Sequence, residues 1–283
     1  MQLNLSCGAL GIPASQRQAI DLAARHGFDV VEADGKYLGG LPDGELHDLL
    51  AAMRAKRIGW STAGLPVNFR RDDATFHSGM DGLAAYASGL RRAGVRSVTT
   101  WVNPGSNELP YPANFRLHTA RLGEIAGVLD GAAVRLGVEY VGTKTAWVSQ
   151  HYPFIHTMAE MRALIAEMKR PNVGLVLDSW HWYQAGDSAA DILALRPVDV
   201  VSVDLNDAPA GIAKDRMVDN RRELPASTGV IDLKTFLESL KRIGFSGPVR
   251  AEPFNEAVQR MSPDDSAEAA AASLRKAFTA AGI

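Results

Sequence analysis

The sequence predicts an α/β protein that folds as a single parallel (β/α)8 barrel over residues 1–283. Strand-like runs alternate with helix-like runs from end to end, which is typical of a parallel sheet with crossover helices. Eight such units in this length match one barrel, and no Pro/Ser-rich linker divides the chain. A doubly wound sheet is the alternative, although no GxGxxG motif follows the first strand.

The eight predicted strands are short apolar runs, several of which end in a polar or charged residue. They are LNLSCGAL (3–10), DVVEAD (29–34), IGWSTAGLP (58–66), SVTTWVNP (97–104), VEYVGTK (138–144), VGLVLDSW (173–180), VVSVDLND (200–207) and PVRAEPF (248–254).

Helices are predicted between the strands from apolar stripes at helical spacing. Residues 232–244 carry one such stripe, with Asp232 as a cap at the start and Gly244 at the end. A methionine-rich stripe in residues 156–171 is interpreted as core packing, because methionine fills irregular gaps. The Ala-rich segment 264–278 is expected to be an outer helix.

The composition, with 46% hydrophobic and 22% charged residues, is ordinary for a globular protein. A formal net charge of −2 argues against a nucleic-acid or anionic-membrane partner, which usually requires a basic field. The N-terminus does not resemble a signal peptide, no apolar run reaches the ~20 residues of a membrane span, and there is one cysteine, Cys7. A cytoplasmic location is therefore expected, with a homo-oligomer possible.

Four predicted strands in the second half of the chain carry an acidic residue near the end: Glu139, Asp178, Asp204 and Glu252. The C-terminal strand ends of such a barrel build its active site. In residues 200–207 the alternation places Val201, Val203 and Leu205 toward the helices, and Asp204 in the lumen.

Carboxylates that converge in a barrel mouth repel one another, and each buried ion costs several kcal/mol unless it is compensated. A divalent cation relieves all of them, whereas protonation relieves one or two. An oxygen-only set favours Mn²⁺ or Mg²⁺. The alternative is that these residues are unrelated loop caps and surface acids.

Several other residues could line the same pocket. His181 follows Asp178 by three residues and could bind metal, orient Asp178 or contact substrate. Trp180, Trp182 and Tyr183 could form a flat wall for a sugar, or roof the barrel. Glu32 and Trp101 end strands on the opposite side, and Lys144 could hold an anionic or hydroxyl group or pair with an acid.

The segments GVEYVG, NVGLVLDSWHWY, DLND, RRELPASTGVIDLKTFLESLKRIGFSGPV and AEPF together resemble the xylose-isomerase-like TIM barrel superfamily. The likeness is strongest over residues 130–257 and is greatest to its 2-keto-myo-inositol (inosose) isomerase and epimerase branch.

The resemblance implies a divalent metal held by Glu139, Asp178, Asp204 and Glu252. Asp204 stands where the family usually has histidine, so the site is either richer in oxygen or lacks this ligand. The resemblance also makes His181 a substrate contact and Arg222 the best match for a substrate-binding arginine, with Arg221 and Arg216 as alternatives.

The implied function is a metal-dependent isomerase or epimerase of a keto-sugar or keto-cyclitol, acting through an enediolate with Glu139 and Glu252 as acid–base groups. Substrate contacts are expected from His181, Arg222, Trp101, Lys144 and Trp180. The alternative is a lyase or dehydratase that expels water or an aglycone, and a wide aromatic lip formed by Trp180, Trp182 and Tyr183 would suit a bulky leaving group. An abasic-site nuclease and a non-catalytic sugar-binding barrel are the remaining readings of the same fold.

Overall fold

The computed structural model describes residues 1–283 and confirms the predicted barrel. Parallel strands close in the order β1-β10-β9-β8-β6-β4-β3-β2, so the doubly wound alternative is wrong. The barrel strands are β1 (Gln2–Leu5), β2 (Val30–Ala33), β3 (Gly59–Gly64), β4 (Ser97–Trp101), β6 (Arg135–Glu139), β8 (Val173–Asp178), β9 (Val200–Leu205) and β10 (Pro248–Ala251).

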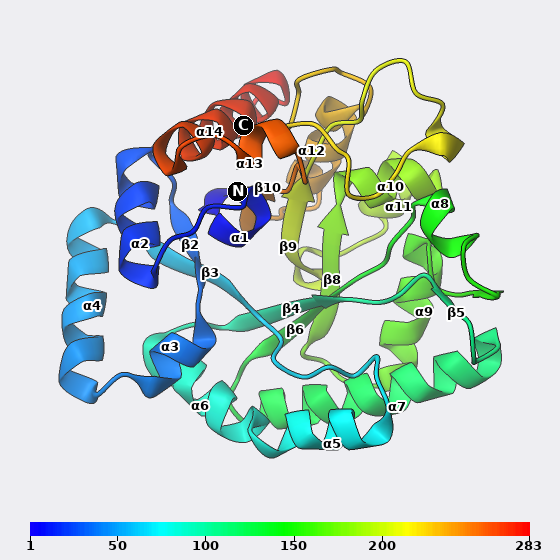
Figure 1. The fold of residues 1–283 in the computed structure, drawn as a ribbon, viewed down its shortest axis with the longest axis horizontal. Helices are drawn as coiled ribbons and strands as arrows, with labels where there is room; N and C mark the ends of the chain where they lie inside the picture. Colours follow the sequence, from blue (N-terminus) through cyan, green and yellow to red (C-terminus); the bar gives the residue numbers. More distant parts are fainter.

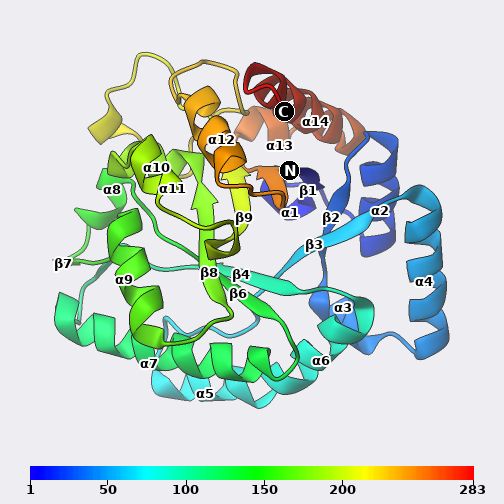
Figure 2. The ribbon, with the colours of Figure 1, turned by 180° about the vertical axis from the view of Figure 1, so that it is seen from behind.

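Helices surround the barrel, as Figures 1 and 2 show from opposite sides. They are α1 (Cys7–Leu10), α2 (Gln16–Arg25), α3 (Gly35–Gly40), α4 (Asp43–Lys56), α5 (Asp73–Asp81), α6 (Leu83–Ala93), α7 (Tyr111–Asp130), α8 (Lys144–Trp147), α9 (Met158–Met168), α10 (Ser179–Ala185), α11 (Ala189–Leu193), α12 (Leu233–Arg242), α13 (Glu256–Gln259) and α14 (Pro263–Ala280), with 3-10 turns at Pro197–Asp199 and Lys214–Arg216. The last helix, α14, packs beside α2 and α12 and thereby closes the ring.

The two helices predicted from apolar stripes are confirmed. In α12, Asp232 accepts a hydrogen bond from the Thr235 amide, and the helix buries Leu233, Phe236, Leu237 and Leu240. In α9, Thr157 and Glu160 form a capping box, and the methionines of the stripe are buried. None of the helices combines the length and the apolar character that crossing a membrane requires.

Register between neighbouring strands sets which side chains meet at the barrel mouth. Asp178 on β8 is the Cα partner of Asp204 on β9, and Asp204 is the partner of Arg250 on β10. Trp101 at the end of β4 is the partner of Glu139 at the end of β6. The short strands β5 (Gly105–Ser106) and β7 (Tyr152–Pro153) pair antiparallel and join the loops that follow β4 and β6.

A register shift between β8 and β9 modifies the predicted alternation. The shift brings the Val201 side chain close to Gly137. Gly137 lies two residues before Glu139 on β6, so both face the lumen of the barrel. Val201 was expected to face the helices; the extra residue at the shift moves it toward the lumen instead. Asp204, beyond the shift, faces the lumen as predicted.

Gly137→Ala is expected to destabilise the protein. The added methyl would lie 3.0 Å from Val176 Cγ2, 3.1 Å from Val201 Cβ and 3.2 Å from Thr99 Cγ2, and overpacking of this kind costs about 1–3 kcal/mol. Urea unfolding measures the change in the free energy of unfolding. The control is Gly44→Ala on α4, where nothing lies within 4 Å of the new methyl and a gain of roughly 0.5–1 kcal/mol is expected. Equal stability of the two variants would contradict this account of the lumen.

Candidate active site

A cavity of about 480 Å³ opens at the C-terminal ends of the strands. This is the end of a barrel at which active sites form, and the volume suits a small polar ligand. The polar side chains in its wall come from β2, β4, β6, β10 and the residue after it, α10 and the long loop after β9, and are Glu32, Thr99, Thr100, Glu139, Arg250, Glu252, His181, Asp219, Asn220 and Arg222. Trp101 and Phe254 supply aromatic surface.

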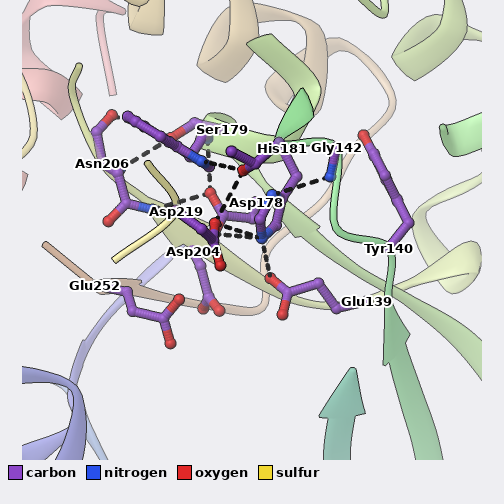
Figure 3. A network of polar contacts seen from close by, with 12 residues as sticks. Glu139, Tyr140, Gly142, Asp178, Ser179, His181, Asp204, Asn206, Asp219 and Glu252 are labelled. Carbon is purple, nitrogen blue, oxygen red and sulfur yellow. Dashed lines mark hydrogen bonds and ion pairs between the residues drawn. The ribbon is translucent and has the colours of Figure 1, made fainter. Parts of the chain in front are cut away.

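The four acidic residues predicted from strand ends meet at this end of the barrel, where Glu139 and Glu252 line the cavity and Asp178 and Asp204 are buried and do not line it. Glu139, Asp178, Asp204 and Glu252 are all buried, and one oxygen of each lies within 4.8 Å of one oxygen of every other. Figure 3 shows their side chains converging from neighbouring strands, with Asp204 between Glu252 and Glu139 in this view.

Asp178 ends β8 and also caps α10. Its Oδ1 accepts hydrogen bonds from the Trp180 amide at 2.6 Å and from Asn206 Nδ2 at 2.9 Å, and its Oδ2 accepts one from Arg222 at 2.7 Å. The strand therefore ends in a carboxylate because that side chain starts the next helix while it faces the site.

Glu139 has a different environment. Its Oε1 is buried and has no hydrogen-bond partner. Burial, and then the nearby charges of Glu252 and Asp178, raise the pKa of Glu139 well above its ordinary value. An unpartnered buried carboxylate oxygen is costly, so this atom is the part of the cluster that most requires a proton or a cation.

Arg222 is fully buried and holds the acidic residues together. Its Nη1 donates to Asp178 at 2.7 Å and to Glu252 at 3.1 Å, and its Nη2 donates to Asp219 at 2.9 Å. Its guanidinium packs over Phe254, with 4.7 Å between the central carbon and the ring centroid. Of the three arginines considered from the sequence, Arg222 lies in the site, whereas Arg216 and Arg221 are exposed.

The loop that carries Arg222 is anchored by Asp207. The two carboxylate oxygens of Asp207 accept hydrogen bonds from the amides of Thr228, Gly229 and Ile231, and its backbone pairs with Glu223. This buried residue therefore fixes both ends of the segment between β9 and α12, rather than joining the carboxylate cluster.

Sequence reasoning missed a second arginine at the site, Arg250, whose side chain is 17% exposed. Its Nε and Nη2 donate to the two oxygens of Asp204, each at 2.8 Å, and Nη2 also donates to Glu252 Oε1 at 2.8 Å. Arg250 lies two residues before Glu252, on the same face of the strand. The period of two along β10 was therefore the signal that could have identified it.

His181 lies in the cavity wall, on the first turn of α10. Its Nδ1 is 3.2 Å from the Gly142 amide, and its Nε2 is 3.3 Å from Arg222 Nη2. Burial lowers the pKa of His181. Its Nε2 is 3.9 Å from the nearest oxygens of both Glu139 and Asp178, so His181 borders the carboxylate cluster.

The other predicted substrate contacts divide into one at the cavity and two away from it. Trp101 lines the cavity with 46% of its surface exposed, and Arg70 stacks on its ring at 4.1 Å. Trp180 is fully buried beneath the site, where its Nε1 donates to Thr143, and it does not line the cavity. Lys144 also lies outside the cavity lining and pairs with Asp215 at 3.7 Å.

The predicted aromatic wall after β8 is therefore wrong. Trp182 packs edge-on against Phe236, and Tyr183 lies beneath Lys214. Because α10 begins directly at Asp178, its side chains are distributed around a helix, and most of these aromatics turn into the core.

Most residues of the carboxylate cluster are suited to bind a divalent cation. The donors of this group are all carboxylate oxygens, as hard cations prefer, and Glu139 Oε1 has no hydrogen-bond partner. His181 forms a second candidate group with Glu139 and Asp178. Oxygens bound to one ion at about 2.1 Å lie no more than about 4.2 Å apart, so a small contraction of the cluster would suffice. Asp204 differs from the others because Arg250 bonds to both of its oxygens.

The metal-free protein is expected to lose stability as the pH rises from about 6.5 to 8, above the range in which the lowered pKa values of buried His118 and His181 act in the opposite sense. Burial, with Asp204 and Asp178 nearby, raises the pKa of Glu252 from 4.5 to about 8, despite the opposing effect of Arg250 and Arg222. The folded state thus keeps a proton that the unfolded state has already released, and stability falls as that proton is lost. Glu139 acts in the same direction.

Thermal unfolding in chelator between pH 6.5 and 8.5 measures this effect. Glu252→Gln is expected to flatten the decline, whereas Glu256→Gln, an exposed glutamate four residues later, should leave it unchanged. A wild-type melting temperature that rises through this interval would contradict the assignment.

Comparison with known proteins places the chain among enzymes of this architecture. Residues 20–277 match the sequence model of the xylose isomerase-like TIM barrel family. An inosose isomerase of Bacillus velezensis is 24% identical over 90% of this chain and 89% of its own. A xylose isomerase domain protein from Alicyclobacillus acidocaldarius is 29% identical, with a TM-score of 0.84 over 99% of this chain and 98% of its own. The IolI protein crystallised with a bound zinc atom is 20% identical, with a TM-score of 0.82 over 99% and 98% of the two chains, and so shares the fold.

The match over most of the chain confirms the resemblance read from the motifs around the carboxylates. The protein belongs to the xylose isomerase-like TIM barrel family.

Proposed function

We propose that this protein is a divalent-metal-dependent isomerase or epimerase of an uncharged keto-sugar or keto-cyclitol, acting through an enediolate. The observation that carries the proposal is the buried cluster of carboxylates beside a cavity, at the strand ends where a (β/α)8 barrel builds its active site. Relatives named inosose isomerase and ketose 3-epimerase support this reaction class.

The residues suited to hold the ion are Glu139, Asp178 and Glu252, while Asp204, the fourth ligand expected from the sequence, is paired with Arg250. A divalent ion at this position supplies positive charge where negative charge develops on a substrate oxygen.

Glu139 and Glu252 are the proposed acid–base pair. They extend from β6 and from the end of β10, and their oxygens approach within 4.8 Å. Their raised pKa values make each carboxylate, when ionised, a stronger base than an exposed glutamate. One removes a proton from the carbon beside the carbonyl. The other returns a proton to the opposite face of that carbon for epimerisation, or to the adjacent carbon for isomerisation.

The remaining cavity residues have binding roles in this proposal. His181 and Arg222 offer polar contacts for substrate hydroxyls, and Trp101 offers an exposed ring for the apolar face of a sugar. Acidic side chains outnumber the two arginines in the cavity wall, and both arginines already bond to carboxylates. This charge favours an uncharged polyol over a phosphorylated substrate.

The lyase alternative loses its main support. It rested on a wide aromatic lip formed by Trp180, Trp182 and Tyr183, and none of the three lines the cavity. Isomerase or epimerase chemistry is therefore the single function proposed.

Glu139→Gln and Glu252→Gln are each expected to lower kcat by about 10²–10⁴, the usual contribution of a general acid or base. The assay is a screen of keto-sugars and inososes with added Mn²⁺ in deuterated water, in which turnover incorporates deuterium and leaves the carbon skeleton unchanged. Glu256→Gln is the matched control and should retain activity. Full turnover by Glu252→Gln would contradict the acid–base assignment, and a product lighter by one water would indicate elimination.

Removal of divalent ions with a chelator is expected to abolish turnover and to lower the melting temperature. Re-addition of Mn²⁺ at about 100 times its Kd should restore both, with a gain of about 2.7 kcal/mol in the free energy of unfolding. Differential scanning calorimetry at fixed pH measures the gain. Turnover that persists after exhaustive chelation would exclude metal dependence.

A further inference from the structure

We infer that Asp204 serves as the anchor of Arg250 and does not bind the metal, so that the ion is held by the three carboxylates of Glu139, Asp178 and Glu252. The inference deepens the proposed function and rests on its metal dependence.

The first observation is the geometry of the pair. Arg250 Nε and Nη2 each lie 2.8 Å from a different oxygen of Asp204, which is the parallel two-bond arrangement of a strong arginine–carboxylate pair. Strand register makes the two residues Cα partners on adjacent strands, so the pairing is built into the barrel. Asp204 is 1% exposed.

The second observation is how the two guanidinium groups share the acidic residues. Arg222 divides its hydrogen bonds among Asp178, Asp219 and Glu252, so it neutralises none of them fully. Arg250 gives Asp204 two bonds and Glu252 one. Asp204 is thus the carboxylate whose two oxygens are both bound by a single guanidinium, whereas Glu252 is bound by one arginine at each oxygen and Glu139 Oε1 has no partner.

Recruiting Asp204 to a cation would require its separation from Arg250. Separating this largely buried pair would leave an uncompensated charge, which is costly. The other groups near Arg250 are Glu252, itself suited to the metal, and Glu32 at 3.6 Å. A three-carboxylate site avoids this cost.

The pair then has a positioning role. Anchored on Asp204, Arg250 directs its Nη2 to Glu252 Oε1 at 2.8 Å. It thus fixes the orientation of Glu252, which the proposed mechanism uses. The family resemblance leads one to expect a histidine ligand at the β9 position that Asp204 occupies.

Calorimetric titration of Mn²⁺ into the metal-free, full-length protein tests the inference. Asp204→Asn together with Arg250→Gln removes both charges of the pair, and the Kd is expected to rise about tenfold, because Glu252 loses its hydrogen bond from Arg250 and residues that orient metal ligands contribute 10–100-fold to affinity. Arg250→Gln alone removes the same hydrogen bond but frees Asp204, so its Kd should be lower than that of the double variant. Glu139→Gln is the ligand control and should weaken binding at least about 100-fold.

A double variant that loses as much affinity as Glu139→Gln would overturn the inference and leave the metal-dependent function standing. Wild-type protein that binds no divalent ion would overturn the proposed function, and the inference with it. Should the variants fail to fold, a crystal structure of Mn²⁺-loaded wild-type protein identifies the ligands directly: three carboxylates with water support the inference, and Asp204 bound to the ion overturns it.

Discussion

The repulsion among buried carboxylates is the constraint on which the rest of this site depends. Four neighbouring strand ends bring buried acidic side chains to within 4.8 Å of one another. The protein relieves part of that repulsion with the guanidinium groups of Arg222 and Arg250 and part by raising pKa values. The remaining negative charge is what gives the site its proposed affinity for a divalent ion and its basicity.

The two arginines that contact the cluster come from different parts of the fold, one from a barrel strand and the other from a loop. Arg250 lies on a barrel strand, so its pairing with Asp204 forms with the barrel itself. Arg222 lies on the long loop after β9, which docks because buried Asp207 binds three of its amides. The pair of Arg250 and Asp204 is thus held by the barrel strands. The position of Arg222, which bridges the other carboxylates, depends instead on how the loop packs.

The barrel and the carboxylates were predictable from the sequence because both follow local periodicities. Fully apolar runs such as 173–177 predict buried parallel strands, and apolar stripes such as that of α12 predict helices with recognisable caps. The acidic residues were identified because strand ends converge in any parallel barrel. Trp180 and Lys144 were misplaced because both were treated as continuations of a strand, although helices start at Ser179 and Lys144.

By itself, then, the sequence determined the fold class, the family and the acidic ends of the late strands, since each depends on residue type and spacing along the chain. Only the tertiary structure decided which charges pair. Asp204 meets Arg250 through the register of β9 against β10, and Arg222 meets Asp178 across 44 residues through a docked loop. Contacts of this kind depend on how strands align and loops close, which no local pattern specifies.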